Sequence, residues 1–73
     1  MMIRRDLLAG EIARSGHTKA SVAKAIGITP KTFYLKEKTG VFGRDEIVKI
    51  VEVCNISNPM QIFFPEFVAQ QET

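Results

Sequence analysis

Apolar residues recur three and four positions apart along most of the chain, and this spacing predicts helices. No segment carries the strand signal, a strict alternation of apolar and polar residues. Glycine, proline and capping residues divide the chain into five predicted helices, at about residues 3–15, 19–26, 30–37, 45–54 and 59–64. The pattern predicts an all-α fold, in which residues 1–73 form one compact five-helix domain with a short tail after about Phe67.

Residues 18–36 have the layout of a helix-turn-helix at the centre of this domain. Thr18 can cap the first of the two helices through its hydroxyl, and Gly27 can adopt the left-handed conformation that ends it. Thr29 can cap the second helix, and Pro30 falls at its first position, where a missing N–H costs nothing. Such a unit places its second helix in the DNA major groove; an ordinary helical hairpin is the alternative.

Several short motifs lie along residues 3–64, namely Thr18-Lys19, Val22-Ala23, Ile26-Gly27-Ile28-Thr29, Thr32-Phe33, Glu46-Ile47-Val48-Lys49-Ile50 and Ile56. Together they resemble the Cro/repressor family of phage and bacterial helix-turn-helix proteins, often called XRE-like. Residues 32–36 and the Phe63-Phe64 ending look most like small regulators from phages of Gram-positive hosts. The resemblance implies a phage-type transcriptional regulator, a Cro-like repressor that binds operator DNA through its third helix.

Three positions depart from that family's pattern. Lys19 stands where the family usually has a glutamine that helps to grip a phosphate. Glu37 stands where the family usually has an apolar or turn-proximal residue facing the core. Residues 38–40, Lys-Thr-Gly, replace the more usual Asn-Gly turn. The expected fold is unchanged by these differences.

Phe33 is the large apolar residue of the third helix and is expected to point into the core. Residues two before and two after it lie about 200° round the helix, so Lys31 and Leu35 are expected to face outward. The resemblance places the base-reading positions at Pro30, Lys31 and Leu35. Lys31 can donate to the acceptor edge of guanine, and Leu35 or Pro30 can pack on a thymine methyl. Without Gln, Asn or Arg for bidentate contacts, we expect modest sequence specificity.

Phosphate contacts are expected around this face. The second helix begins at Lys19, so its first amides and the ammonium group can meet a phosphate. Tyr34 can bond a phosphate or, alternatively, pack against the second helix. The full set of predicted DNA-binding residues is Thr18, Lys19, Thr29, Pro30, Lys31, Thr32, Tyr34, Leu35, Lys36 and Lys38.

Charge is divided unevenly between the two parts of the chain. Residues 1–44 carry a net charge of +6 and residues 45–73 a net charge of −4, within a total of only +2. A basic part that contains the helix-turn-helix suits a polyanion on that side of the molecule.

Composition limits the other functions of the chain. One histidine and one cysteine cannot assemble a closed metal site, and no nucleophile–base pair stands out, so we expect neither catalysis nor a cofactor. No apolar run is long enough to cross a membrane, and the N-terminus lacks the apolar region of a signal peptide. A single cysteine, Cys54, fits a reducing bacterial cytoplasm, and its place on the inward stripe of the fourth helix predicts burial.

Two classes of partner remain open. The first is double-stranded operator DNA, favoured by the basic part and by the helix caps. The second is a protein: an anti-repressor or modulator with the same fold would bind the partner lysogenic repressor. An outward Leu35, with Tyr34, Pro30 and Val41 nearby, favours this second class.

The C-terminal part has more large apolar residues than the lid of a small core needs. The excess suggests an exposed patch for a homodimer or for a partner protein, whereas complete internal packing is the alternative. The residues concerned are Met60, Ile62, Phe63, Phe64 and Phe67.

Overall fold

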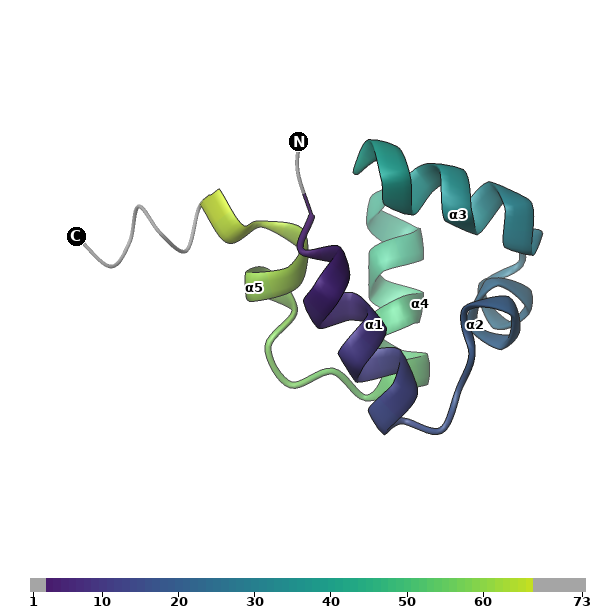
Figure 1. The fold of residues 1–73 in the computed structure, drawn as a ribbon, viewed down its shortest axis with the longest axis horizontal. Coiled ribbons are helices and arrows are strands. Elements are labelled where there is room, and N and C mark those ends of the chain that lie inside the picture. The colour runs from purple at the N-terminus through teal and green to yellow at the C-terminus, as the bar shows by residue number, and fades with distance from the viewer. Residues whose placement is uncertain (1–2, 67–73) are drawn as a thin grey trace.

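Five helices and no strand make up residues 3–66, the part of the chain that the computed structural model describes (Figure 1). The all-α expectation is therefore confirmed, and the tail predicted after about Phe67 lies outside the described residues. The helices are α1 (Arg5–Arg14), α2 (Lys19–Ile26), α3 (Pro30–Thr39), α4 (Arg44–Cys54) and α5 (Pro59–Phe63).

The caps predicted for the helix-turn-helix are present. The Thr18 hydroxyl accepts the backbone N–H of Ser21 at 3.1 Å, and the Ser21 hydroxyl accepts the N–H of Thr18 at 2.9 Å. This reciprocal pair satisfies two amides that the first turn of α2 leaves free. Gly27 ends α2 with φ of +89°, and Thr29 starts α3 by accepting the N–H of Thr32 at 3.2 Å. Local chemistry thus sets the boundaries of both helices.

The third helix is longer than its sequence pattern indicated, since it ends at Thr39 rather than at about residue 37. The residue that ends it is Gly40, which has the left-handed φ of +74° and donates its N–H to the Lys36 carbonyl at 2.9 Å. Thr39 lies in the last turn of α3, where its hydroxyl donates to the Leu35 carbonyl at 2.9 Å. The loop before α4 is correspondingly short.

Three phenylalanines connect the helix-turn-helix to the rest of the core. The rings of Phe33 and Phe42 meet edge to face with centroids 5.5 Å apart, and Phe42 meets Phe63 in the same way at 6.1 Å. Phe33 and Phe63 are fully buried, and Phe42, from the loop after α3, is buried between them. This contact fixes α3 against α5 through a loop residue.

The C-terminal apolar residues are neither all buried nor all exposed. Ile62 and Phe63 are buried, Phe64 is partly buried, and Met60 is exposed. The N–H of Arg4 donates to the carbonyl of Ile62 at 2.8 Å, which holds α5 beside the start of α1. With only one turn and a half of helix docked in this way, the face that carries Met60 is left in solvent. Phe67 lies outside the described residues.

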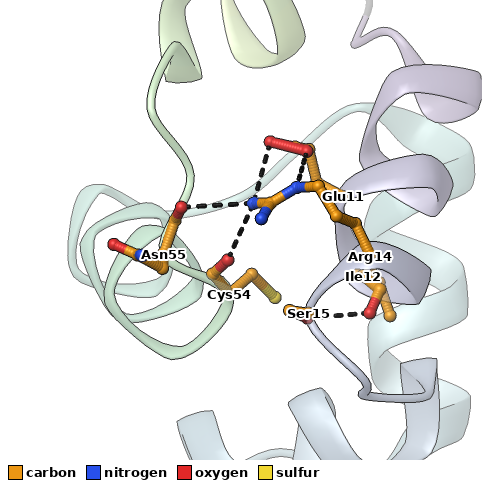
Figure 2. A network of polar contacts seen from close by, with 6 residues as sticks. All are labelled: Glu11, Ile12, Arg14, Ser15, Cys54 and Asn55. Atoms are coloured by element: carbon orange, nitrogen blue, oxygen red, sulfur yellow. Dashed lines mark hydrogen bonds and ion pairs between the residues drawn. The ribbon is translucent and has the colours of Figure 1, made fainter.

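Arg14 joins the last turn of α1 to the end of α4, as Figure 2 shows. Its Nη2 donates to the carbonyls of Cys54 and Asn55 at 3.3 and 3.2 Å, while Nε donates to Glu11 at 2.8 Å. The last carbonyls of a helix lack hydrogen-bond donors within the helix, and here the Arg14 guanidinium donates to two of them. Asn55 ends α4 in the left-handed conformation, with φ of +51°, as predicted.

None of the helices in residues 3–66 combines the length and the apolar character that a membrane crossing requires.

Replacing Phe33 by alanine should destabilise the domain by about 3–5 kcal/mol, the cost of truncating a buried phenylalanine. The reason is that Phe33 is fully buried and its ring contacts Phe42. Urea unfolding followed by helical circular dichroism measures the loss. Leu35→Ala, on the outer side of the same helix, is the matched control and should change the free energy of unfolding by less than about 0.5 kcal/mol. Equal effects of the two changes would contradict the orientation of α3.

Candidate nucleic-acid interface

The outer face of α3 carries the side chains that the sequence predicted there. Lys31, Tyr34, Leu35 and Lys38 are exposed, with half of the Leu35 surface open to solvent, while Phe33 faces the core. Pro30 lies exposed at the N-terminal tip of the helix. Leu35 is thus an exposed apolar residue on the outer face, as its spacing from Phe33 predicts.

Thr18 and Thr32, in the first turns of α2 and α3, each keep a hydroxyl proton for a further partner. Thr29 donates its hydroxyl to the hydroxyl oxygen of Thr32 at 2.9 Å, so the proton of Thr32 remains free. Thr18 accepts the N–H of Ser21, which likewise leaves the Thr18 proton free. Hydroxyls at helix N-termini are common donors to DNA phosphates. Both residues are therefore suited to the phosphate contacts predicted for them.

Lys19 is already engaged within the fold. Its ammonium donates to Oε1 of Glu37 at 3.0 Å and lies 3.0 Å from Oε2 as an ion pair, while 45% of the side chain stays exposed. An ammonium has three donors, so Lys19 keeps protons that can reach a phosphate. Its position in the fold is set by Glu37.

Glu37 is the buried charge beneath this face, with only 1% of its surface exposed. The carboxylate lies between Lys19 of α2 and Arg5 of α1, whose Nη2 is 3.5 Å from Oε1. It thereby connects three helices. The sequence offered a signal for this burial, because Glu37 follows Phe33 by four residues and so lies on the same side of α3.

Lys36 is directed toward the fold rather than toward a ligand. Its ammonium donates to Oε1 of Glu46 at 3.2 Å, and the same oxygen accepts the N–H of Gly43 at 2.7 Å. Together they hold the middle of α3 against the first turn of α4. The structure thus gives Lys36 an internal ion pair, while 31% of its side chain stays exposed, and Lys38 is the more exposed lysine of this turn. The phosphate contact expected of Lys36 stays a prediction.

Tyr34 contacts α1 through Arg5. The guanidinium carbon of Arg5 lies 5.9 Å from the centre of the Tyr34 ring, within the range of a cation–π contact. Arg5 therefore bridges the buried Glu37 and the exposed Tyr34. The sequence analysis missed Arg5 because its partners are more than 25 positions away in the chain.

The exposed charges of α2 and α3 all have one sign. Between residues 18 and 40 the chain has a single acid, Glu37, and this acid is buried. Exposed cations lie on both helices and on the start of α1. Among the described residues, neither α2 nor α3 has an exposed carboxylate to oppose them. The exposed cations are Arg5, Lys19, Lys24, Lys31 and Lys38.

Other chemistry has little support among the described residues. Within residues 3–66 no group of three or more histidine, cysteine or acidic side chains is placed to hold a metal ion. His17 has its Nδ1 3.1 Å from the Ser21 hydroxyl, beside the start of α2. Cys54 is buried as predicted, and that burial raises the pKa of its thiol.

Comparisons of the chain with protein-family models, with curated proteins and with solved structures find no match. The function proposed below therefore depends on the geometry of this face and on the sequence motifs.

Removing the two cations around Glu37 should cost far more than removing the acid. Arg5→Ala combined with Lys19→Ala leaves a buried carboxylate without a counter-charge, for which we expect a loss of about 3–5 kcal/mol. Glu37→Met replaces the acid with an apolar side chain of similar length and should be neutral or stabilising, since the cations return to water. Urea unfolding of the three proteins gives the comparison. A Glu37→Met protein as unstable as the double variant would show that the charge itself is needed for folding.

Acid should remove the contribution of Glu46. Partial burial acts to raise the pKa of Glu46, but the Gly43 N–H and the Lys36 ammonium lower it more, so the pKa lies below its ordinary value. A lowered folded-state pKa gives stability above the unfolded pKa, and this stability is lost as the pH falls through the folded pKa. The wild type should exceed Glu46→Gln in stability near neutral pH and lose this advantage on acidification. Thermal melts across pH measure it, with Glu52→Gln as control; a pH-independent difference would contradict the ion pair.

Proposed function

We propose that the protein is a transcription regulator of the Cro-like type, which binds operator DNA by placing α3 in the major groove. The observation that supports this most is the capped α2–α3 unit whose exposed charges are all positive. A polyanion is the partner that such a surface attracts, and a protruding capped helix fits the groove.

In this proposal Lys31 and Leu35 read base edges from the middle of the outer face, and Pro30 packs at the tip. Lys31 donates to guanine, and Leu35 contacts a thymine methyl. One lysine and two apolar groups discriminate weakly among sequences. We therefore propose modest sequence specificity, with most of the affinity supplied by the phosphate backbone.

The phosphate contacts come from groups that keep free protons in the fold. The hydroxyls of Thr18 and Thr32 and the ammonium groups of Lys19 and Lys38 have such protons and lie at the edges of the outer face. Arg5 adds a guanidinium next to Tyr34. Glu37 would hold Lys19 and Arg5 in place before DNA arrives, which lowers the entropy cost of binding.

A second candidate is a protein-binding modulator with the same fold, acting on a partner repressor. The observation that favours it is apolar exposure at α3: Tyr34, Leu35 and Val41 have 51%, 50% and 62% of their surface in solvent. Exposed aromatic and aliphatic side chains of this kind are typical anchors of protein interfaces.

Binding to duplex DNA should depend strongly on salt. Neutralising about three to four phosphates per chain gives a slope near −3 when the logarithm of the binding constant is plotted against that of the salt concentration. Gel-shift titrations on the intergenic DNA beside the gene, at several salt concentrations and with and without the adjacent repressor, measure it. A binding constant that barely changes with salt would exclude the electrostatic mechanism.

Single changes on the outer face of α3 distinguish the two partners. If the partner is DNA, Lys31→Ala should lower affinity and reduce the salt slope, while Leu35→Ala should alter preference at one base pair. If the partner is a protein, Leu35→Ala should cause most of the loss, as a buried interface anchor would, and salt should have little effect. Lys49→Ala, on α4, is the control.

The double variant Lys31→Ala with Leu35→Ala should fold normally, within about 0.5 kcal/mol of the parent, because both side chains are exposed. It should nevertheless lose regulation in a reporter assay. A double variant that folds and still regulates would place the functional surface elsewhere on the molecule.

A further inference from the structure

The outward side of α4 is apolar at its centre. Ile50 and Cys54 bury the inner side of the helix, whereas Val48 has 47% of its surface exposed and Ile47 and Val51 are only partly buried. An open hollow of about 440 Å³ lies beside Val48, and most of its lining is apolar; it is formed by Phe42, Arg44, Ile47, Val48 and Phe64. None of the predicted DNA-binding residues lies on this surface.

Two opposite charges lie at equal distances on either side of Val48. Arg44 precedes it by four residues and Glu52 follows it by four, so all three lie along one face of the helix. Both charged residues are exposed. The ion pairs formed within residues 3–66 join other side chains, which leaves Arg44 and Glu52 without a partner in that part of the chain.

This arrangement is complementary to itself. If a second copy of α4 packs antiparallel, with the two-fold axis at Val48, each Arg44 lies opposite the other copy's Glu52. Parallel packing would instead place like charges together. A two-fold interface requires a patch that matches its own rotated copy, and an apolar centre with opposite charges at equal distances is such a patch.

We propose that the Arg44–Val48–Glu52 face of α4 is a self-association surface that binds a second copy of this chain antiparallel. The two Val48 side chains meet at the axis beside the apolar hollow of each copy, and two Arg44–Glu52 ion pairs close the ends. A helix of 11 residues is only about 16 Å long. The interface is therefore small, and the dimer is weak and concentration-dependent.

The pairing leaves α3 uncovered. Lys36 and Glu46 hold α3 beside the first turn of α4, and α4 runs away from it (Figure 1). In an antiparallel pair the two α3 helices lie toward opposite ends. Self-association is therefore measured without DNA, so its failure leaves the proposed function untouched.

Charge exchange between two variants tests the proposal on the full chain. Sedimentation equilibrium at about 1 mM should detect the wild-type dimer, since small contacts associate only at high concentration. Arg44→Glu places glutamates opposite each other, and Glu52→Arg places arginines opposite each other, so each variant alone should be monomeric. An equimolar mixture of the two should associate again, because every facing pair is then of opposite sign.

Two controls keep the result specific. Lys49→Glu makes the same charge change as Arg44→Glu one position beyond Val48, off this face, and should dimerise like the wild type. The double variant Arg44→Glu with Glu52→Arg restores both pairs in reverse and should dimerise while showing helical circular dichroism equal to the parent. A strictly monomeric wild type at about 1 mM would overturn the proposal. A mixture that stays monomeric while the wild type dimerises would also overturn it, and so would equal losses from Lys49→Glu and Arg44→Glu.

Discussion

The burial of Phe33 is the constraint on which the rest of the arrangement depends. Its ring occupies the core against Phe42, and Phe42 in turn meets Phe63 of α5. Once this side of α3 is fixed inward, helical geometry leaves Lys31 and Leu35 no direction other than outward. The loop after α3 is also fixed, because Phe42 must fold back to complete the contact. The composition of the outer face therefore follows from the packing of one aromatic side chain.

Glu37 is a buried carboxylate on the inner side of the same helix. A buried carboxylate requires counter-charges, and the two it has come from α1 and α2. This requirement draws Arg5 and Lys19 to the border of the exposed surface, where both keep about half of their side chains in solvent. A group that costs free energy to bury thus positions cations where a polyanion can meet them. The stability and the proposed function of the helix-turn-helix are linked at this residue.

The two surfaces proposed for contact differ in the way their charges are arranged. On α2 and α3 the exposed charges have one sign, which suits a partner of the opposite sign. On α4 an arginine and a glutamate flank an apolar centre at equal distances, which suits a rotated copy of the same surface. A surface with charges of one sign repels its own copy, so the α2–α3 surface does not favour a dimer. The α4 surface carries both signs, so it does not favour DNA.

Local sequence determined the helices and their ends. Caps at Thr18 and Thr29, the glycine at 27 and the apolar spacing act over a few residues, and the structure agrees with them; the inward direction of Phe33 followed from the same spacing. The pattern predicts an end of α3 at about residue 37, two residues before the actual end at Thr39, where Gly40 takes the left-handed conformation. Only the tertiary structure decided the partners of the charges: Arg5 and Lys19 with Glu37, Lys36 with Glu46, and Arg14 with the end of α4. These pairs join residues far apart in the chain, and no local pattern specifies which helices will meet.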